Sequence, residues 1–221
     1  EEVFPDTNNR GGVCFFLRDT SVSNENYILV ANHYDNGVVC EEKRIQKVEG
    51  LDIFIRSNKS LSVLDKVIKG TGENDWMYRH ISAAKAFGLR TFFIKDPRFK
   101  QPSIGLVEPI KCYGRGGSVG FVEKKDILSH TEWIKLWKVY VPESNNIGTE
   151  LNDDNQNAIV GAPNTICTET YLVVGADLNL SKLKATNCAQ YLKTKFARFL
   201  LSLAKVSQHG TAKTYRFVPV V

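Results

Sequence analysis

The sequence predicts an α+β fold, and three observations support this prediction. Short apolar and β-branched stretches of strand length recur along most of the chain, separated by polar or glycine-rich turns. Apolar residues at helical spacing occur mainly in two places, one in the first third of the chain and one near its end. The sequence contains no internal repeat and no low-complexity segment. Strands mixed with a few helices are typical of the α+β class.

The first third of the chain is expected to form short strands followed by a helix. Strands are predicted at 4–5, 13–17 and 27–30, and Gly11-Gly12 fits a tight turn that enters the second of them. Ser60 can cap a helix that stops at Gly70-Thr-Gly72. The buried face of this helix is predicted to consist of Leu61, Leu64, Val67 and Ile68.

The central part of the chain is expected to be mainly β-structure. Gly114–Gly117 fits the turn of a hairpin, and a polar loop rich in asparagine covers 144–157. The segment 165–174 is β-branched and aromatic, which favours a strand. The other strands are predicted at 104–112, 119–122 and 134–141.

The last part of the chain is expected to be a helix followed by a strand at 215–221. From 178 to 205, an apolar stripe at helical spacing lies beside a basic stripe that contains Lys195, Arg198, Ser202 and Lys205. The apolar stripe consists of Cys188, Leu192, Phe196, Phe199, Leu200 and Leu203.

Composition and chain ends point to a soluble, cytoplasmic protein that has no membrane partner. Hydrophobic residues make up 43% of the chain and charged residues 24%, which is ordinary for a globular protein. No apolar run approaches the ~20 residues that span a bilayer. Glu1-Glu2 stands where a signal peptide would need basic residues. The chain lacks an initiator methionine, so we expect it to be cut from a longer protein.

The cysteines and histidines indicate no metal site. The five cysteines form no CxxC pair, and the four histidines are equally scattered, whereas zinc sites need clustered ligands. We therefore expect buried free thiols in a reducing compartment and no metal ligands.

Charge is distributed unevenly in two segments. The stretch from Leu178 to the end carries eight lysines and arginines but no acid, so the rest of the chain is net acidic. Between Arg79 and Lys100, seven basic residues (including His80) are interleaved with aromatics, against the single acid Asp96. Such segments favour a polyanionic partner or a solvated surface. Phe87, Phe92 and Phe93 are expected in the core.

Several blocks resemble one family. Glu2-Val-Phe-Pro5 and Gly11-Gly-Val-Cys-Phe-Phe-Leu17 resemble the closing strands of the catalytic domain in N6-adenine DNA methyltransferases of type II restriction–modification systems. Further blocks, in the same order as in one branch of that family, are Phe87-Gly-Leu-Arg-Thr91, Cys167-Thr-Glu-Thr-Tyr-Leu-Val173, Tyr191-Leu-Lys-Thr-Lys-Phe-Ala-Arg-Phe-Leu200 and Lys213-Thr-Tyr-Arg-Phe-Val-Pro219. Ala197 departs from this branch, in which an aromatic residue is common at that position.

The resemblance implies a division of labour. Residues 1–45 would be the end of a Rossmann-like methyltransferase domain, and 46–221 a mixed sheet-and-helix DNA target-recognition domain. The chain has no adjacent prolines, so it lacks the Asn-Pro-Pro-(Tyr/Phe) loop that grips the target adenine. Catalysis with S-adenosylmethionine would therefore belong to an upstream domain of the full-length protein. Some relatives also carry a fused endonuclease. No cofactor and no catalytic residue are expected in this segment.

Eight basic residues are the predicted contacts to double-stranded DNA. Arg90 is the first choice, because it follows Gly88, where a backbone and a ligand can approach closely; a structural salt bridge is the alternative. Arg115 sits between glycines at the predicted hairpin tip. On a strand, Lys213 and Arg216 would face opposite sides, so only one of them would face DNA. The full set is Lys85, Arg90, Arg115, Lys195, Arg198, Lys205, Lys213 and Arg216.

Glu169 and Thr170 are candidates for reading base edges, because a glutamate can accept a hydrogen bond from the amino group of cytosine. A buried Glu169 paired with a cation is the alternative. Two other functions stay open for the chain as a whole. One is a basic module that binds an acidic protein. The other is a metal-dependent nuclease that uses Glu41-Glu-Lys43 or Glu123-Lys-Lys125 with Asp6, Asp19 or Asp35.

Overall fold

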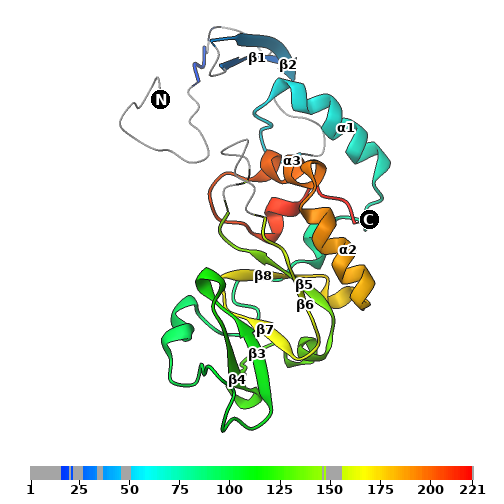
Figure 1. Ribbon diagram of the computed structural model, residues 1–221. Helices are drawn as coiled ribbons and strands as arrows, with labels where there is room; N and C mark the ends of the chain where they lie inside the picture. The colour runs from blue at the N-terminus through cyan, green and yellow to red at the C-terminus, as the bar shows by residue number, and fades with distance from the viewer. Residues whose placement is uncertain are drawn as a thin grey trace.

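The computed structural model describes residues 16–19, 21, 27–33, 37–45, 51–145, 147 and 156–220. This part of the chain has an α+β fold, as predicted, with three small sheets, three α-helices and several short 3-10 helices. Figure 1 shows the hairpin β1–β2 at one end of the molecule and the hairpin β3–β4 at the other, with β5 and β8 between them. Within these residues, no helix combines the length and apolar character needed to cross a bilayer.

The first hairpin consists of β1 (Tyr27–His33) and β2 (Val39–Ile45), paired antiparallel. The predicted strand at 27–30 is confirmed and extends further. The side chain of Asn32 joins the hairpin to the next segment, because it donates to the carbonyl of Arg56 (2.9 Å) and accepts from the amide of Asn58 (3.0 Å). The predicted strand at 4–5 and residues 13–15 of the next one lie outside the described residues, while Phe16 and Leu17 are exposed and not in a strand.

The predicted helix is confirmed as α1 (Leu61–Gly70). Leu64 is buried in the core, and the other residues of the predicted face, Leu61, Val67 and Ile68, pack partly buried against the same core. Ser60 occupies the N-cap position, although its side chain makes no capping hydrogen bond.

A second hairpin is formed by β3 (Pro109–Tyr113) and β4 (Val119–Glu123), as predicted, with Gly114–Gly117 in the turn. The predicted strand at 104–112 starts only at Pro109. The short strand β7 (Thr165–Cys167) pairs parallel with β3 and completes a sheet in the order β4-β3-β7.

The third sheet has the order β6-β5-β8, with β5 (Lys138–Pro142) in the centre between β6 (Ile159–Gly161) and β8 (Tyr171–Val174). The strand predicted at 134–141 therefore starts later than expected, because Thr131–Lys135 form the 3-10 helix η6.

The β6-β5-β8 sheet is buried on both faces. Val139, Val141 and Leu172 belong to a first core beneath the three α-helices, whereas Tyr140 and Val173 belong to a second core that also contains β3 and β4 residues. Alternate residues of a strand point to opposite faces. The two cores therefore share this one sheet.

The prediction of a single strand at 165–174 is wrong. β7 ends at Cys167 and β8 begins at Tyr171, and the two strands belong to different sheets. The turn Thr168–Thr170, which we call the crossing turn, carries the chain from one sheet to the other. Its hydroxyls bond each other, with Thr168 Oγ1 and Thr170 Oγ1 2.9 Å apart.

The single helix predicted at 178–205 is two helices, α2 (Lys182–Leu192) and α3 (Lys195–Ala204). Thr194 separates them, because its hydroxyl accepts from the amide of Ala197 (3.2 Å) and caps α3. The prediction of a strand at 215–221 is wrong. Tyr215 ends the 3-10 helix η8 (Ala212–Tyr215), which has a capping box between Thr211 and Thr214, and in the described residues 216–220 only Pro219 makes an isolated bridge, with Trp76.

The four cysteines in the described part are free thiols, as predicted. Cys112 and Cys167 are buried in the second core, and Cys40 and Cys188 are half-buried. Burial raises the pKa of Cys112 to about 12, so its thiol stays protonated at neutral pH.

Candidate nucleic-acid interface

The crossing turn contacts two segments that lie far from it in sequence. The amide of Glu169 donates to the carbonyl of Leu89 (2.8 Å), and the amide of Thr168 donates to the carbonyl of Tyr113 at the end of β3 (2.9 Å). The turn therefore lies beside both Arg90 and the hairpin tip that carries Arg115.

The carboxylate of Glu169 holds the start of the 3-10 helix η3 (Thr91–Lys95). Its Oε1 accepts from the amide of Thr91 (2.9 Å) and from the Thr91 hydroxyl (3.2 Å). Arg90 Nη1 lies 4.0 Å from the other oxygen, Oε2, and the Arg90 side chain is 60% exposed. A pair at this distance in solvent is weak. The guanidinium of Arg90 can therefore turn to a phosphate or a base edge at little cost.

The tip of the β3–β4 hairpin lies against η3. Gly114 is buried there, and a Cβ on it would lie 2.3 Å from Ile94 Cγ2. Only a residue without a side chain allows this approach. Arg115, the next residue, is exposed. The fold thus brings Arg90 and Arg115 to the same 3-10 helix, although they are far apart in the sequence.

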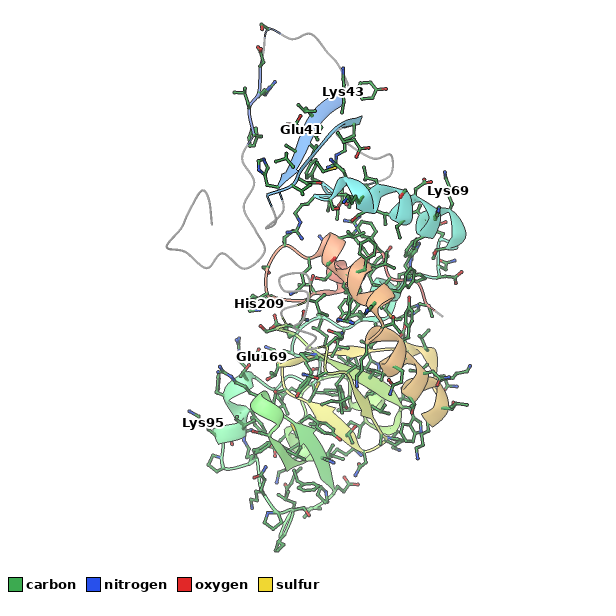
Figure 2. All side chains as sticks on the ribbon, turned by 45° about the horizontal axis from the view of Figure 1, so that its top comes forward. Glu41, Lys43, Lys69, Lys95, Glu169 and His209 are labelled. Atoms are coloured by element: carbon green, nitrogen blue, oxygen red, sulfur yellow. The ribbon has the colours of Figure 1, made fainter. Side chains whose placement is uncertain are left out.

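Lys85 and Lys95 are two further exposed cations, one before η3 in the sequence and one within it. Lys85 is exposed at the start of a tight turn, with a φ of 61° and its carbonyl accepting from the amide of Gly88 (3.0 Å). Figure 2 shows Lys95 projecting outward from the ribbon, on the same side of the molecule as Glu169. Within the described residues, the side chains of Lys85, Lys95 and Arg115 make no hydrogen bond or ion pair. We call Lys85, Arg90, Lys95 and Arg115 the basic face.

The carboxylate of Asp96, the acid of this segment, is paired with Arg98. Arg98 Nη2 lies 2.7 Å from Asp96 Oδ2, and further bonds from Arg98 to this carboxylate lower the pKa of Asp96 to about 2. The guanidinium of Arg98 also lies over the ring of Phe93, 5.0 Å from its centroid. The contacts of Arg98 with Asp96 and Phe93 therefore stabilise the end of η3. Because Asp96 pairs with Arg98, it does not neutralise a cation of the basic face.

The remaining predicted contacts lie on α3 and η8, which pack against each other and onto the first core. Lys195 is exposed at the start of α3. Arg198 Nε donates to the carbonyls of Lys193 (3.1 Å) and Thr194 (3.3 Å), so its side chain covers the end of α2.

Lys213 and Arg216 do not point to opposite sides, as they would on a strand. Arg216 pairs with Asp52, and the charge of Lys213 also acts on that carboxylate and helps lower its pKa. Residues three apart lie one above the other on a 3-10 helix. The structure thus gathers both cations around Asp52.

Among the predicted DNA contacts, Lys205 differs most clearly from the expectation. It is 4% exposed, and its ammonium donates to the carbonyls of Asn145 and Ile147 (2.5 and 3.2 Å). Burial lowers its pKa. The prediction that Lys205 contacts DNA is therefore wrong, because this side chain points into the protein.

The residues of the nuclease alternative do not form a recognisable ion site in the described part. There, no group of three or more His, Cys, Asp or Glu side chains is arranged to hold a metal ion. Glu123 forms an ion pair with Lys125 instead. Asp6 and Asp35 lie outside the described residues.

Comparisons of the chain with models of protein families, with curated proteins and with solved structures found no match. The restriction–modification interpretation therefore depends on the quoted blocks. The structure adds that two of these blocks meet, because Glu169 of the 167–173 block bonds to Leu89 and Thr91 of the 87–91 block.

Sequence reasoning did not select Lys95 as a contact, although it lies in the segment noted for its charge. The sequence contains a feature that could have indicated Lys95. Asp96 is the single acid of this segment, and Arg98, two residues away, can pair with it in place of Lys95. A carboxylate bonded to Arg98 leaves Lys95 exposed and unpaired.

Proposed function

We propose that this chain is the DNA target-recognition region of an adenine-specific methyltransferase from a restriction–modification system. The observation that carries the proposal is the joint at Glu169, which holds Arg90 and the η3 helix beside the Arg115 hairpin tip. Two segments distant in sequence, one with Arg90 and one with Arg115, thus present cations next to each other, and the crossing turn joins them. The class of methyltransferase comes from the sequence resemblance alone.

On this proposal, the basic face binds duplex DNA in two ways. Lys85 and Lys95 neutralise phosphates, which fixes position but carries no sequence information. Arg90 and Arg115 address guanine edges in the major groove, where an arginine can donate to both O6 and N7. Methyl transfer from S-adenosylmethionine takes place in the catalytic domain of the longer protein, which receives the flipped adenine.

The test is fluorescence anisotropy of the purified chain with a pool of random-sequence 30-bp duplexes, titrated with salt. Binding in the micromolar range should weaken linearly in log salt. Arg90→Ala and Arg115→Ala should each weaken binding, and Lys85→Ala should lower the salt slope by about one.

Lys69→Ala is the matched control for these variants. Lys69 is also an exposed lysine, but it pairs with Asp65 on α1 (2.7 Å), at the upper right of Figure 2, whereas Lys95 lies at the lower left. The control should bind like the wild type. Absence of binding at low salt, or equal losses in Lys69→Ala and Arg90→Ala, would contradict the proposal.

A further inference from the structure

Phe92 is exposed where the sequence predicts a core residue. Its neighbours Phe87 and Phe93 are buried in the second core, as predicted. Phe92 is 68% exposed, so the prediction is wrong for this residue. Consecutive side chains of a 3-10 helix point about 120° apart, because the helix has three residues per turn, and in η3 it is Phe93 that faces the core.

The geometry of η3 places Phe92 on the same side as Lys95. In a 3-10 helix, side chains at i and i+3 lie one above the other. Thr91 and Ile94 occupy the side that meets Glu169 and Gly114. Phe93 occupies the side that faces the core. The remaining side carries Phe92 and Lys95, both exposed.

The backbone beneath Phe92 is held at several points. The amide of Phe93 donates to the carbonyl of Arg90 (3.0 Å), and the amide of Asp96 donates to the carbonyl of Phe93 (2.9 Å). Glu169 fixes the first residue of the helix, and the Arg98–Asp96 pair fixes the end. A ring displayed from a fixed backbone loses little conformational freedom when it is covered.

We propose that Phe92 is an apolar wedge that inserts between two adjacent base pairs of bound duplex DNA, while Lys95 neutralises the neighbouring phosphate. This inference rests on the proposed function and adds a contact to it. A phenyl ring can stack on any base, because every base has a π-face. Apolar side chains inserted in this way partly unstack a base step and kink the duplex.

The charges around Phe92 favour DNA as the occupant. An apolar side chain that docks on a protein is expected in an apolar surrounding, with charges depleted around it. Phe92 instead shares its side of η3 with the exposed Lys95, and the carboxylate next in sequence, Asp96, is paired with Arg98. An exposed ring beside an unpaired cation matches a partner that has flat apolar bases between rows of phosphates.

The wedge is tested by its effect on DNA topology. A closed circular plasmid is relaxed by topoisomerase I in the presence of saturating chain and then freed of protein. The wild type should leave negative supercoils, because an unstacked step is also untwisted. Phe92→Ala should leave the plasmid relaxed and bind random duplexes about 10-fold more weakly. Its salt slope should match the wild type, because the phosphate contacts remain.

Two further variants complete the design. Phe92→Tyr keeps the ring and should retain the supercoils. Phe196→Ala removes another exposed phenylalanine, which lies on α3 and is 44% exposed, and it should behave like the wild type. DNA binding without any change in topology, or the same change in Phe92→Ala, would overturn the wedge and leave the proposed function standing. Absence of DNA binding by the wild type would overturn both.

Discussion

One oxygen of the Glu169 carboxylate accepts two hydrogen bonds from Thr91, one from its amide (2.9 Å) and one from its hydroxyl (3.2 Å). The two residues come from distant parts of the chain. Their contact joins the crossing turn to the helix that displays Phe92 and Lys95. Every prediction about the basic face depends on this joint.

Two substitutions of Glu169 distinguish the effect of its negative charge from the effect of its hydrogen bonds to Thr91. Glu169→Gln keeps a carbonyl oxygen for Thr91 and removes the negative charge. We expect unchanged stability and a few-fold tighter binding to random duplexes, because a repulsion with phosphate is lost. Glu169→Ala removes both hydrogen bonds and should lower the free energy of unfolding by about 1 kcal/mol. Urea denaturation and anisotropy measure the two effects; identical behaviour of the two variants would contradict this division.

Gly114→Ala should push the hairpin tip away from η3. The new Cβ would lie 2.3 Å from Ile94 Cγ2, and overpacking of this kind costs about 1–3 kcal/mol. We expect lower stability and weaker DNA binding, because Arg115 moves away from Arg90. Gly116→Ala is the control. Nothing lies within 4 Å of its Cβ position, although its φ of +66° is unfavourable for alanine, whereas the φ of Gly114 is −123°.

The double variant Gly114→Ala/Ile94→Ala tests the cause of this effect. Removing the Ile94 methyl groups relieves the clash, so DNA binding should be partly restored relative to Gly114→Ala. A double variant that binds DNA no better than Gly114→Ala would show that the contact with Ile94 does not set the position of the tip.

Lys205→Met should destabilise the fold without affecting DNA binding. The carbonyls of Asn145 and Ile147 would lose their donor, at a cost of about 2 kcal/mol. Lys195→Met is the matched control on the surface of α3. Its stability should stay within about 0.5 kcal/mol of the wild type. Weaker DNA binding of Lys205→Met in anisotropy, with unchanged stability in urea denaturation, would restore the sequence-based assignment of Lys205.

The stability of the protein should depend on pH through Lys138. This side chain is fully buried, and burial lowers its pKa to about 8 from the ordinary 10.5. Between these values the unfolded state binds more protons than the folded state, so stability rises with pH. The gain, on the order of 3 kcal/mol in full, should be absent in Lys138→Met. Denaturation of both proteins at pH 7.5–10 tests this, and parallel curves would contradict it.

The comparison with Lys138→Met is needed because other buried groups titrate in the opposite sense. Burial raises the pKa values of Cys167 and Tyr140, so their contribution to stability is lost as the pH rises above their unfolded values. Both groups are present in the two proteins. The difference between the curves therefore reports the ammonium of Lys138 together with its interaction with Cys167.

Local patterns predicted the elements whose signals lie within a few residues. The helix α1 has an apolar face at helical spacing and ends at Gly70, and the β3–β4 hairpin has its glycines in the turn. The crossing turn was missed because the residues on both sides of it, 165–168 and 171–174, are all buried and form one continuous stretch typical of a strand. A change of sheet inside such a segment is decided by long-range pairing with β3 and β5, which local composition does not encode.

The sequence indicated which kinds of residue the candidate site contains, but it did not indicate which residues these side chains contact. Lys195 and Lys205 share one helical stripe in the sequence, yet one is exposed and the other buried. The difference arises because α3 ends at Ala204 and Lys205 turns toward Asn145. The role of Glu169 could not be assigned for the same reason, since its partner Thr91 is distant in the chain.

The sheet buried on both faces has a consequence for the folding of the whole molecule. Neighbouring residues of β5, such as Val139 and Tyr140, belong to different cores. Neither core can lose this strand without exposing the apolar surface of the other. Melting should therefore be a single cooperative transition across both cores. A destabilising change beneath the helices would then also open the end of the molecule that carries the basic face.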